Sequence, residues 1–488
     1  MENRGVASFV QAGQRAGEWH RKYLEEIRKC RFDTIAVHGV YSMQEALDFN
    51  QGSIIEPVYM STSQAYRNSD EMEAGLAYQI PTWCYTRIAN PSVYYYEGVL
   101  ALLEGYGSGL ETSCMATASG MAAIQSTVDP FLVDDPRKPG GPKNFVATCQ
   151  VYGGTFQQFA IRKEKERGIE WRKIQNPLDL DEWERNIDEN TRFLYGEIPS
   201  NPLLSFFDIE KVAELSHRCN LPLIIDSTVA TPALFRPLQH GADIVVQSVS
   251  KSLAASGFTI CGAVISKKNI TTGIDNDEMK ADFASYIKLL PNRDNGPNIS
   301  PMNAIMALND IRTIRTRMDT VSCSTQKVAE FLQEHKFVES VDYLGLPSHE
   351  LHELASRYLF LADSEHDPRY GEKVNRYGHL MSFRVKGGAQ ATRQVFDAFQ
   401  RIFRATDLGR IKSVATIPAI STHSQQGEEG RKIANIPDNL IRLCVGGEHP
   451  DDIIRDLDQA LGTLDGRKVP ASAPDYSSGG ASSARLAP

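Results

Sequence analysis

The middle of the chain alternates between short apolar runs and stretches with helical spacing of apolar residues. Residues 192–197 predict a strand that stops at a proline-containing turn, after which Asp208 is placed to cap a helix reaching His217. Further strands are predicted at 222–225, which is apolar throughout and so covered on both faces, and at 243–248. Strands alternating with helices predict βα units around a mainly parallel sheet.

Changes in this pattern predict four segments. Residues 1–90 contain a charged amphipathic stretch at 20–31 and then polar irregular sequence, which predicts an N-terminal helix followed by an extended arm. Residues 91–325 predict a large α/β domain, and residues 326–466, with a strand at 380–385, predict a smaller α/β domain. Residues 467–488 are rich in Ser, Ala, Gly and Pro, so we expect a disordered tail.

Composition narrows the class of protein. The 488 residues include 52 basic and 61 acidic side chains, for a formal net charge of −9, which argues against a nucleic-acid partner. The eight cysteines form no C-x-x-C pair, so neither a zinc ribbon nor a disulfide framework is predicted, and we expect no metal site. No leader pattern and no apolar run of eighteen residues is visible, which predicts a cytoplasmic protein without a membrane partner.

Candidate chemistry lies where the predicted strands end. In open α/β sheets ligands bind beyond the carboxyl ends of the strands. Asp226 follows the strand at 222–225 and Lys251 follows the strand at 243–248. Residues 117–124 predict a turn opening into a helix, where free backbone N–H groups attract an anion. The sequence therefore predicts an acid and a lysine at one site, and separately a helix start that can attract an anion.

The sequence around these residues resembles a known family. Residues 221–232, continued by 236–238, 241–243 and 248–251, are similar to the signature of the Cys/Met-metabolism (trans-sulfuration) family of pyridoxal-phosphate (PLP) enzymes, and the last run contains Ser248, Ser250 and Lys251. That family includes cystathionine γ-synthase, O-acetylhomoserine sulfhydrylase, cystathionine γ-lyase and methionine γ-lyase. The resemblance covers about residues 34–464 and implies a fold-type I PLP enzyme. Its large PLP-binding domain has a mainly parallel sheet covered by helices, and its C-terminal α/β domain is smaller.

The resemblance implies how the cofactor is held. Lys251 would carry PLP as a Schiff base and shuttle protons, and Asp226 would keep the pyridinium nitrogen protonated. Tyr152 matches the tyrosine that stacks on the ring and assists departure of the γ-substituent. The residues implied to hold the phosphate are Ser119, Gly120, Met121, Ser248 and Ser250.

Two residues of the first segment are implied to serve a neighbouring subunit. Tyr85 and Arg87 lie in a stretch that resembles the family's Y-x-R-x-x-N-P segment, which reaches the neighbour's cofactor phosphate. The resemblance therefore implies a homo-oligomer, a homotetramer built as a dimer of dimers, with sites shared between subunits.

For the substrate carboxylate, the resemblance implies Arg442, Ser413 and Asn201. Lys412 stands where several members have an acid, and Ser256 lies in a stretch that departs from the family, so substrate preference is left open. Extra polar sequence near residues 134–143, 271–300 and 346–377 is expected to alter access or specificity.

The function implied is γ-replacement in methionine biosynthesis. An O-activated homoserine would react through an external aldimine and a vinylglycine-type intermediate, as in cystathionine γ-synthase or an O-acyl-homoserine sulfhydrylase. One alternative is a γ-lyase that releases 2-oxobutyrate and ammonia, and another is a specialised enzyme that uses a non-sulfur nucleophile. Gly154 stands where methionine γ-lyases tend to carry cysteine, which favours replacement. An aminotransferase and a non-catalytic cofactor-binding protein are further alternatives, which the family motifs and the presence of Lys251 and Asp226 disfavour.

Overall fold

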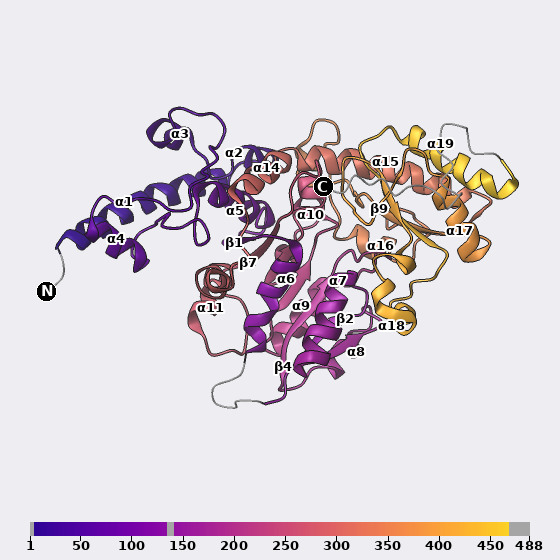
Figure 1. Ribbon diagram of the computed structural model, residues 1–488, viewed down its shortest axis with the longest axis horizontal. Helices are drawn as coiled ribbons and strands as arrows, with labels where there is room; N and C mark the ends of the chain where they lie inside the picture. The colour runs from indigo at the N-terminus through magenta and orange to yellow at the C-terminus, as the bar shows by residue number, and fades with distance from the viewer. Residues whose placement is uncertain (1–3, 134–140, 468–488) are drawn as a thin grey trace, which may run out of the picture.

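The computed structural model describes residues 4–133 and 141–467, which form two sheet-containing regions and a projecting N-terminal arm (Figure 1). The tail predicted from residue 467 therefore lies, from 468 onward, outside the described residues, as does most of the extra segment at 134–143. No helix within the described ranges is long and apolar enough to cross a membrane.

The large region is built on a seven-stranded sheet with strand order β1-β7-β6-β5-β4-β2-β3. Strand β7 is antiparallel to both of its neighbours, and the other pairs are parallel, as the sequence predicted. The strands are β1 (Thr112–Thr117), β2 (Asn144–Thr148), β3 (Glu170–Ile174), β4 (Thr191–Glu197), β5 (Leu223–Asp226), β6 (Ile244–Gln247) and β7 (Gly262–Lys267).

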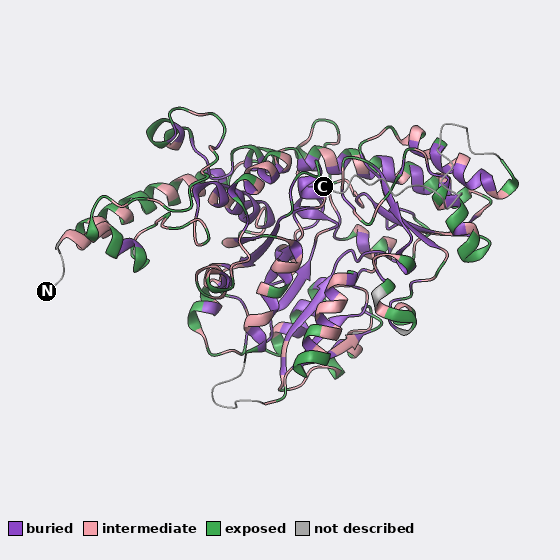
Figure 2. Ribbon diagram, in the orientation of Figure 1, coloured by how far each residue is buried: buried purple, intermediate pink, exposed green. Residues whose placement is uncertain are grey.

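Helices cover both faces of this sheet. Successive residues of β5 point to opposite faces, so that Leu223 and Ile225 join one buried apolar cluster and Ile224 joins another. The apolar run at 222–225 is covered on both sides for this reason, and Figure 2 shows the central strands as buried. The helices of this region are α5 (Pro91–Glu104), α6 (Gly120–Val128), α7 (Gly153–Phe156), α8 (Leu180–Arg185), α9 (Ile209–Arg218), α10 (Thr231–Leu234), α11 (Asp277–Ala281), α12 (Phe283–Ile287), α13 (Arg293–Asn295) and α14 (Pro301–Ile311).

Local sequence explains where α9 begins. The side chain of Asp208 accepts a hydrogen bond from the backbone N–H of Lys211, which satisfies one free donor of the first turn. Val212 and Leu215 are buried on one side of the helix, as their spacing predicted. The helix predicted from Asp208 to His217 is confirmed to within one residue.

The small region contains a five-stranded sheet with strand order β10-β11-β12-β9-β8. The predicted strand at 380–385 is confirmed as its β9. The strands are β8 (Val338–Asp342), β9 (Leu380–Val385), β10 (Phe403–Arg404), β11 (Val414–Thr416) and β12 (Leu440–Cys444). The helices are α15 (Ile314–Glu334), α16 (His352–Ser356), α17 (Gly388–Asp397), α18 (Gly427–Ile433) and α19 (Pro450–Leu461). Helix α15 runs without a break through the boundary predicted at 326.

The arm differs from the prediction. Its first helix is α1 (Arg4–Ile27), which begins sixteen residues before the predicted start, and the stretch expected to be irregular contains α2 (Phe32–His38), α3 (Met43–Phe49) and α4 (Ser69–Leu76). The first half of α1 packs against α4 and its following loop, where Gly13 lies against Ile80. Contacts with a distant segment therefore stabilise turns that the local amphipathic pattern did not predict.

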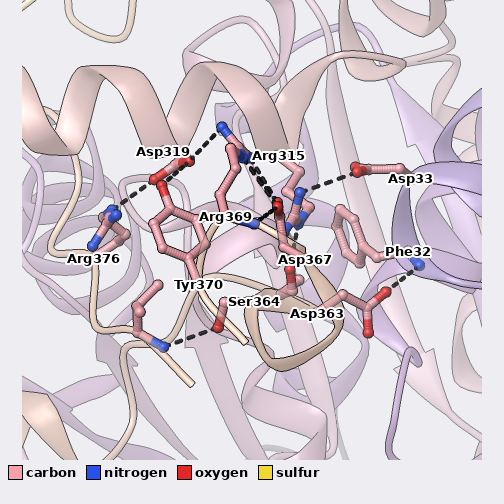
Figure 3. A network of polar contacts seen from close by, with 12 residues as sticks. Phe32, Asp33, Arg315, Asp319, Asp363, Ser364, Asp367, Arg369, Tyr370 and Arg376 are labelled. Atoms are coloured by element: carbon pink, nitrogen blue, oxygen red, sulfur yellow. Dashed lines mark hydrogen bonds and ion pairs between the residues drawn. The ribbon is translucent and has the colours of Figure 1, made fainter. Parts of the chain in front are cut away.

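A network of charged side chains fastens the extra segment 346–377 to the rest of the fold (Figure 3). Arg315 on α15 forms ion pairs with Asp33 of the arm at 3.2 Å and with Asp367 at 2.9 Å. One helical turn further, Asp319 pairs with Arg376 at 2.7 Å. This segment does not line the main cavity described below.

Candidate active site

A cavity of about 430 Å³ opens beyond the carboxyl ends of β4, β5 and β6, with further walls from the small region. The position agrees with the rule for open α/β sheets. Most of the predicted site residues line it, namely Ser119, Gly120, Met121, Tyr152, Asn201, Asp226, Ser248, Ser250, Lys251 and Arg442. Tyr85, Arg87 and Ser413 are described by the structure but do not line it.

One end of the cavity is suited to an anion. Ser119 caps α6 by accepting a hydrogen bond from the backbone N–H of Ala122 at 3.1 Å, so the N–H groups of Gly120 and Met121 belong to a first turn without intrahelical partners. A Cβ atom at Gly120 would lie 2.5 Å from the Cβ of Ser248. Glycine is therefore required for α6 to approach the end of β6 this closely, and this close approach makes the cradle.

The two predicted hydroxyls at the end of β6 have different surroundings. Ser248 lies on the cavity wall beside Gly120. Ser250 also reaches the wall, but its hydroxyl donates to the carbonyl of Cys261 and accepts from the Cys261 N–H, both at 2.9 Å. Ser250 therefore ties the segment before Lys251 to the sequence preceding β7.

Asp226 ends β5 and is only 6% exposed. One oxygen accepts hydrogen bonds from the hydroxyl of Thr228 at 2.6 Å and from its N–H at 3.1 Å, while the other faces the hydroxyl of Tyr195 at 3.4 Å. Burial raises the pKa of Asp226, and the bonds from Thr228 and Tyr195 oppose that rise. A cation bound beside this carboxylate would favour its ionised form.

Glu197, at the end of β4, was not singled out in the sequence. Its carboxylate accepts the backbone N–H of Tyr152 at 2.6 Å and that of Asn201 at 2.8 Å, so one side chain fixes two loops that wall the cavity. Burial and the charge of Asp226 raise the pKa of Glu197, and these two backbone bonds oppose the rise. The sequence contained a signal for Glu197, because this residue ends a predicted strand as Asp226 does. In the structure β4 is the parallel neighbour of β5, and Glu197 is paired in register with Asp226.

Lys251 has an ionic partner that the sequence did not predict. Its Nζ lies 2.7 Å from Oδ1 of Asp407, and the other carboxylate oxygen of Asp407 accepts from Nε of Arg410. All three side chains line the cavity. Burial opposes ionisation of Asp407, but the Lys251 ammonium and Arg410 hold the pKa of that carboxyl below its ordinary value.

Gly409 brings this segment against Lys251. It has a φ of +73°, and a Cβ atom there would lie 2.5 Å from the backbone nitrogen of Ser252. Only glycine allows residues 406–410 to contact the backbone beside Lys251 so closely. The cavity wall therefore includes Thr406, Asp407, Leu408 and Arg410.

Neither Ser413 nor Lys412 lines the cavity. The hydroxyl of Ser413 donates a hydrogen bond to Glu448 at 2.9 Å and accepts one from the N–H of Gly446 at 2.9 Å. Lys412 is exposed, with its ammonium 4.8 Å from the ring centroid of Phe403. Ser256 is also exposed and outside the cavity wall.

Arg442 is placed to bind a carboxylate. It is 1% exposed on β12, and its Nη1 donates to Oδ1 of Asn201 at 3.1 Å while Nη2 donates to the carbonyl of Asp407 at 2.6 Å. Its Nε is buried and has no hydrogen-bond partner among the described residues. A guanidinium held on two sides with a donor to spare suits a carboxylate ligand.

Tyr152 is 39% exposed on the cavity wall, where an aromatic face can cover a flat ring. Tyr85 and Arg87 lie instead on the arm, where the Arg87 guanidinium is 5.4 Å from the ring centroid of Tyr85 and bonds the carbonyl of Arg293. The residues present thus fit a PLP molecule, with a phosphate cradle, an acid for the ring nitrogen, a ring-covering tyrosine and a lysine.

Comparisons with known proteins agree with this geometry. The family described as Cys/Met metabolism PLP-dependent enzyme matches residues 33–462. The chain is 31% identical to O-succinylhomoserine sulfhydrylase from Pseudomonas aeruginosa over 92% of this chain and 99% of the relative. It is 33% identical to L-methionine gamma-lyase from Pseudomonas deceptionensis over 88% of this chain and 97% of the relative.

A solved structure is similar throughout. The crystal structure of a putative O-acetylhomoserine (thiol)-lyase from Campylobacter jejuni, which contains N'-pyridoxyl-lysine-5'-monophosphate, matches with a TM-score of 0.76 and 30% identity. The match covers 88% of this chain and 100% of that one. Since sequence, fold and cavity chemistry agree over nearly the whole chain, this protein belongs to the Cys/Met-metabolism family of PLP-dependent enzymes.

Proposed function

We propose that this protein catalyses γ-replacement on an O-activated homoserine, in the manner of a cystathionine γ-synthase or an O-acyl-homoserine sulfhydrylase. The observation that carries the proposal is one cavity that presents both a lysine with a carboxylate partner and a buried arginine with a free donor. A sulfhydrylase among the relatives, similar over 92% of this chain, supports the reaction class.

Each residue has a separate task in this proposal. PLP, when bound, supplies an electron-withdrawing ring that stabilises negative charge on the carbon bearing the amino group. Lys251 Nζ takes the proton from that carbon and moves protons at the neighbouring carbon. Asp407, 2.7 Å from Nζ, holds the amine in the cavity whenever it is not attached to the cofactor.

Substrate orientation rests on Arg442 and Asn201. Arg442 would bind the α-carboxylate through its unpartnered Nε, and the bond to Asn201 keeps the guanidinium from turning away. Glu197 positions other residues, since its carboxylate holds the backbone of Tyr152 and of Asn201.

The surroundings of Gly154 favour replacement over the methionine γ-lyase alternative. A Cβ atom at this position would lie 2.6 Å from the ring of Tyr152 and 2.9 Å from the sulfur of Met121. A cysteine, which the family resemblance places here in methionine γ-lyases, would have to displace Tyr152. The alternative nevertheless keeps one observation in its favour, which is the 33% identity to an L-methionine gamma-lyase.

Product identification tests the proposal. We expect the purified enzyme to convert O-acetyl- or O-succinyl-homoserine into a γ-substituted amino acid when sulfide or cysteine is supplied, as measured by mass spectrometry. Carbon and nitrogen nucleophiles tested in parallel cover the specialised alternative. Release of 2-oxobutyrate at the same rate with and without any nucleophile would show that the enzyme is a γ-lyase.

We also propose that the active unit is a homo-oligomer, a dimer of dimers, in which the arm of residues 1–90 completes the site of a neighbour. Tyr85 and Arg87 lie outside their own chain's cavity. The arm also exposes several large apolar side chains, including Met43, Phe49 and Ile54, at 75% or more. Exposed apolar surface of this kind marks protein contact sites.

Mixing two inactive variants tests the shared site. Arg87→Ala would lack the phosphate contact given to the neighbour, and Lys251→Ala would lack its own amine. When the two chains are co-expressed, hybrid dimers contain one site with both residues, so activity is expected to recover to about a quarter of wild type. Each variant expressed alone is the control. Absence of recovery in a preparation that native mass spectrometry shows to contain hybrids would contradict the shared site.

A further inference from the structure

A second cavity of about 290 Å³ lies between the small sheet and loops of the large region. Asp342 at the end of β8, Arg384 on β9 and His349 form its wall on the side of the small region. Gln150, which follows β2, and Asn176, which follows β3, face them from the large region. Both predicted domains therefore contribute polar side chains to one cavity outside the active site.

Asp342 and Arg384 are not paired with each other, and Glu350 is a third charged side chain on the wall of this cavity. Asp342 is in register with Ser382, and Ser340 is in register with Arg384, so Asp342 and Arg384 are diagonal neighbours on the same face of the sheet. Such neighbours have side chains about 7 to 8 Å apart at their origins, a span that a small molecule can bridge. No hydrogen bond or ion pair of either side chain is found within residues 4–133 and 141–467.

Three polar atoms at this cavity are buried without a partner among the described residues: Oδ2 of Asp342, Oε1 of Gln150 and Nε of Arg384. Two of these atoms accept hydrogen bonds and the third donates one. Leaving such groups unsatisfied destabilises the folded protein. Burial raises the pKa of Asp342, the charge of Arg384 opposes that rise, and the charge of Glu350 adds to it.

We infer that this cavity binds a free α-amino acid, whose ammonium group pairs with Asp342 and Gln150 and whose carboxylate pairs with Arg384. An α-amino acid carries both charges on neighbouring atoms and so satisfies all three unpartnered atoms at once. A simple anion would leave Asp342 without a donor, and a simple amine would leave Arg384 without an acceptor. Burial lowers the pKa of His349, so His349 adds no further positive charge at neutral pH.

The site is connected to the active-site loops on both sides. Gln150 precedes Tyr152 by two residues. Ser382, which lies in register with Asp342, donates a hydrogen bond at 2.7 Å to the carbonyl of Pro202, directly after Asn201. A bound amino acid would therefore join the two regions and steady the loops that carry Tyr152 and Asn201. We expect it to change the KM for the homoserine substrate more than kcat.

The test separates this site from the active site. Borohydride reduction of the holoenzyme fixes the cofactor to Lys251, so added amines cannot form a new covalent link there. Glycine, L-serine, L-methionine and L-glutamine are then added singly, and thermal unfolding is measured. At least one is expected to raise the melting temperature by a few degrees, whereas propionate and propylamine, each carrying one of the two charges, are expected not to.

Variants assign the effect to the cavity. The shift is expected to disappear in both Arg384→Met and Asp342→Asn and to persist in the control Arg393→Met, which changes an exposed arginine of α17. Arg384→Lys is expected to restore part of it. No shift with any of the four amino acids, or a shift that survives in either Arg384→Met or Asp342→Asn, overturns the inference. Because binding is measured without turnover, this test of the second cavity remains valid even if the enzyme does not catalyse the proposed γ-replacement.

Discussion

Replacing Lys251 with alanine is expected to lower the rate of product formation by about ten-thousand-fold or more, because general acid–base catalysis alone contributes up to about that factor. The side chain is also the point of cofactor attachment, and no second lysine is among the described residues that line the cavity. Borohydride treatment of the purified holoenzyme is therefore expected no longer to leave the cofactor covalently attached to the chain. Steady-state assays measure the first effect, and mass spectrometry of the borohydride-treated protein measures the second.

The control for this variant is Lys412→Ala. Lys412 is exposed and contacts Phe403 outside the cavity, so its removal is expected to change the rate less than twofold. The Lys251 variant is expected to unfold at a temperature close to that of the cofactor-free wild type, since the ion pair that it loses is with the partly exposed Asp407. Retention of more than a tenth of wild-type activity in Lys251→Ala would refute the assignment.

Replacing Asp226 with asparagine is expected to reduce kcat by about a hundred- to a thousand-fold, which is the range for removing one preorganised electrostatic partner. Asparagine keeps the shape of the side chain and can still accept the bonds from Thr228, but it carries no negative charge to favour a protonated ring nitrogen. The loss is therefore expected in kcat, with a displaced absorption maximum of the bound cofactor.

The matched control is Asp208→Asn, which changes the same residue type at the cap of α9, where the side chain does not line the cavity. It is expected to lower the melting temperature slightly and to leave kcat unchanged. Cofactor content must be measured for both variants, because a weaker cofactor hold would lower activity in a way that added PLP reverses. If Asp226→Asn retains full kcat at saturating PLP, Asp226 does not act on the ring nitrogen.

Much of the site could be predicted because it is built from strand ends. Asp226 and Lys251 were expected from the position of two apolar strands, and the cradle at Ser119 from a turn that opens a helix. In a parallel sheet, the carboxyl ends of neighbouring strands meet at one edge, so residues that end consecutive strands come together whatever the loops do. Arg442 was found through the family resemblance, and the structure places it in the same cavity.

Other residues of the site could not be predicted from the sequence. Asp407 and Arg410 lie in a short irregular segment more than 150 residues after Lys251, and only the close approach at Gly409 brings them to the amine. Ser413, three residues after Arg410, has a residue type that can bind a carboxylate ligand, but its hydroxyl donates a hydrogen bond to Glu448. No local sequence pattern predicts which of these three side chains faces the cavity, because the packing of the small region on the large one decides it.

The order of apolar runs and strand-ending polar residues was sufficient to determine the mainly parallel sheet and the lysine and acid at its edge, and the motifs around these residues indicated the family by resemblance. These features depend on local periodicity and on chain direction, both of which can be determined from the sequence. The tertiary structure alone decided the partner of Lys251, the role of Glu197, the full length of α1 and the cavity between Asp342 and Arg384. Those features depend on contacts between segments far apart in the chain, whose distances are fixed only when the two regions pack together.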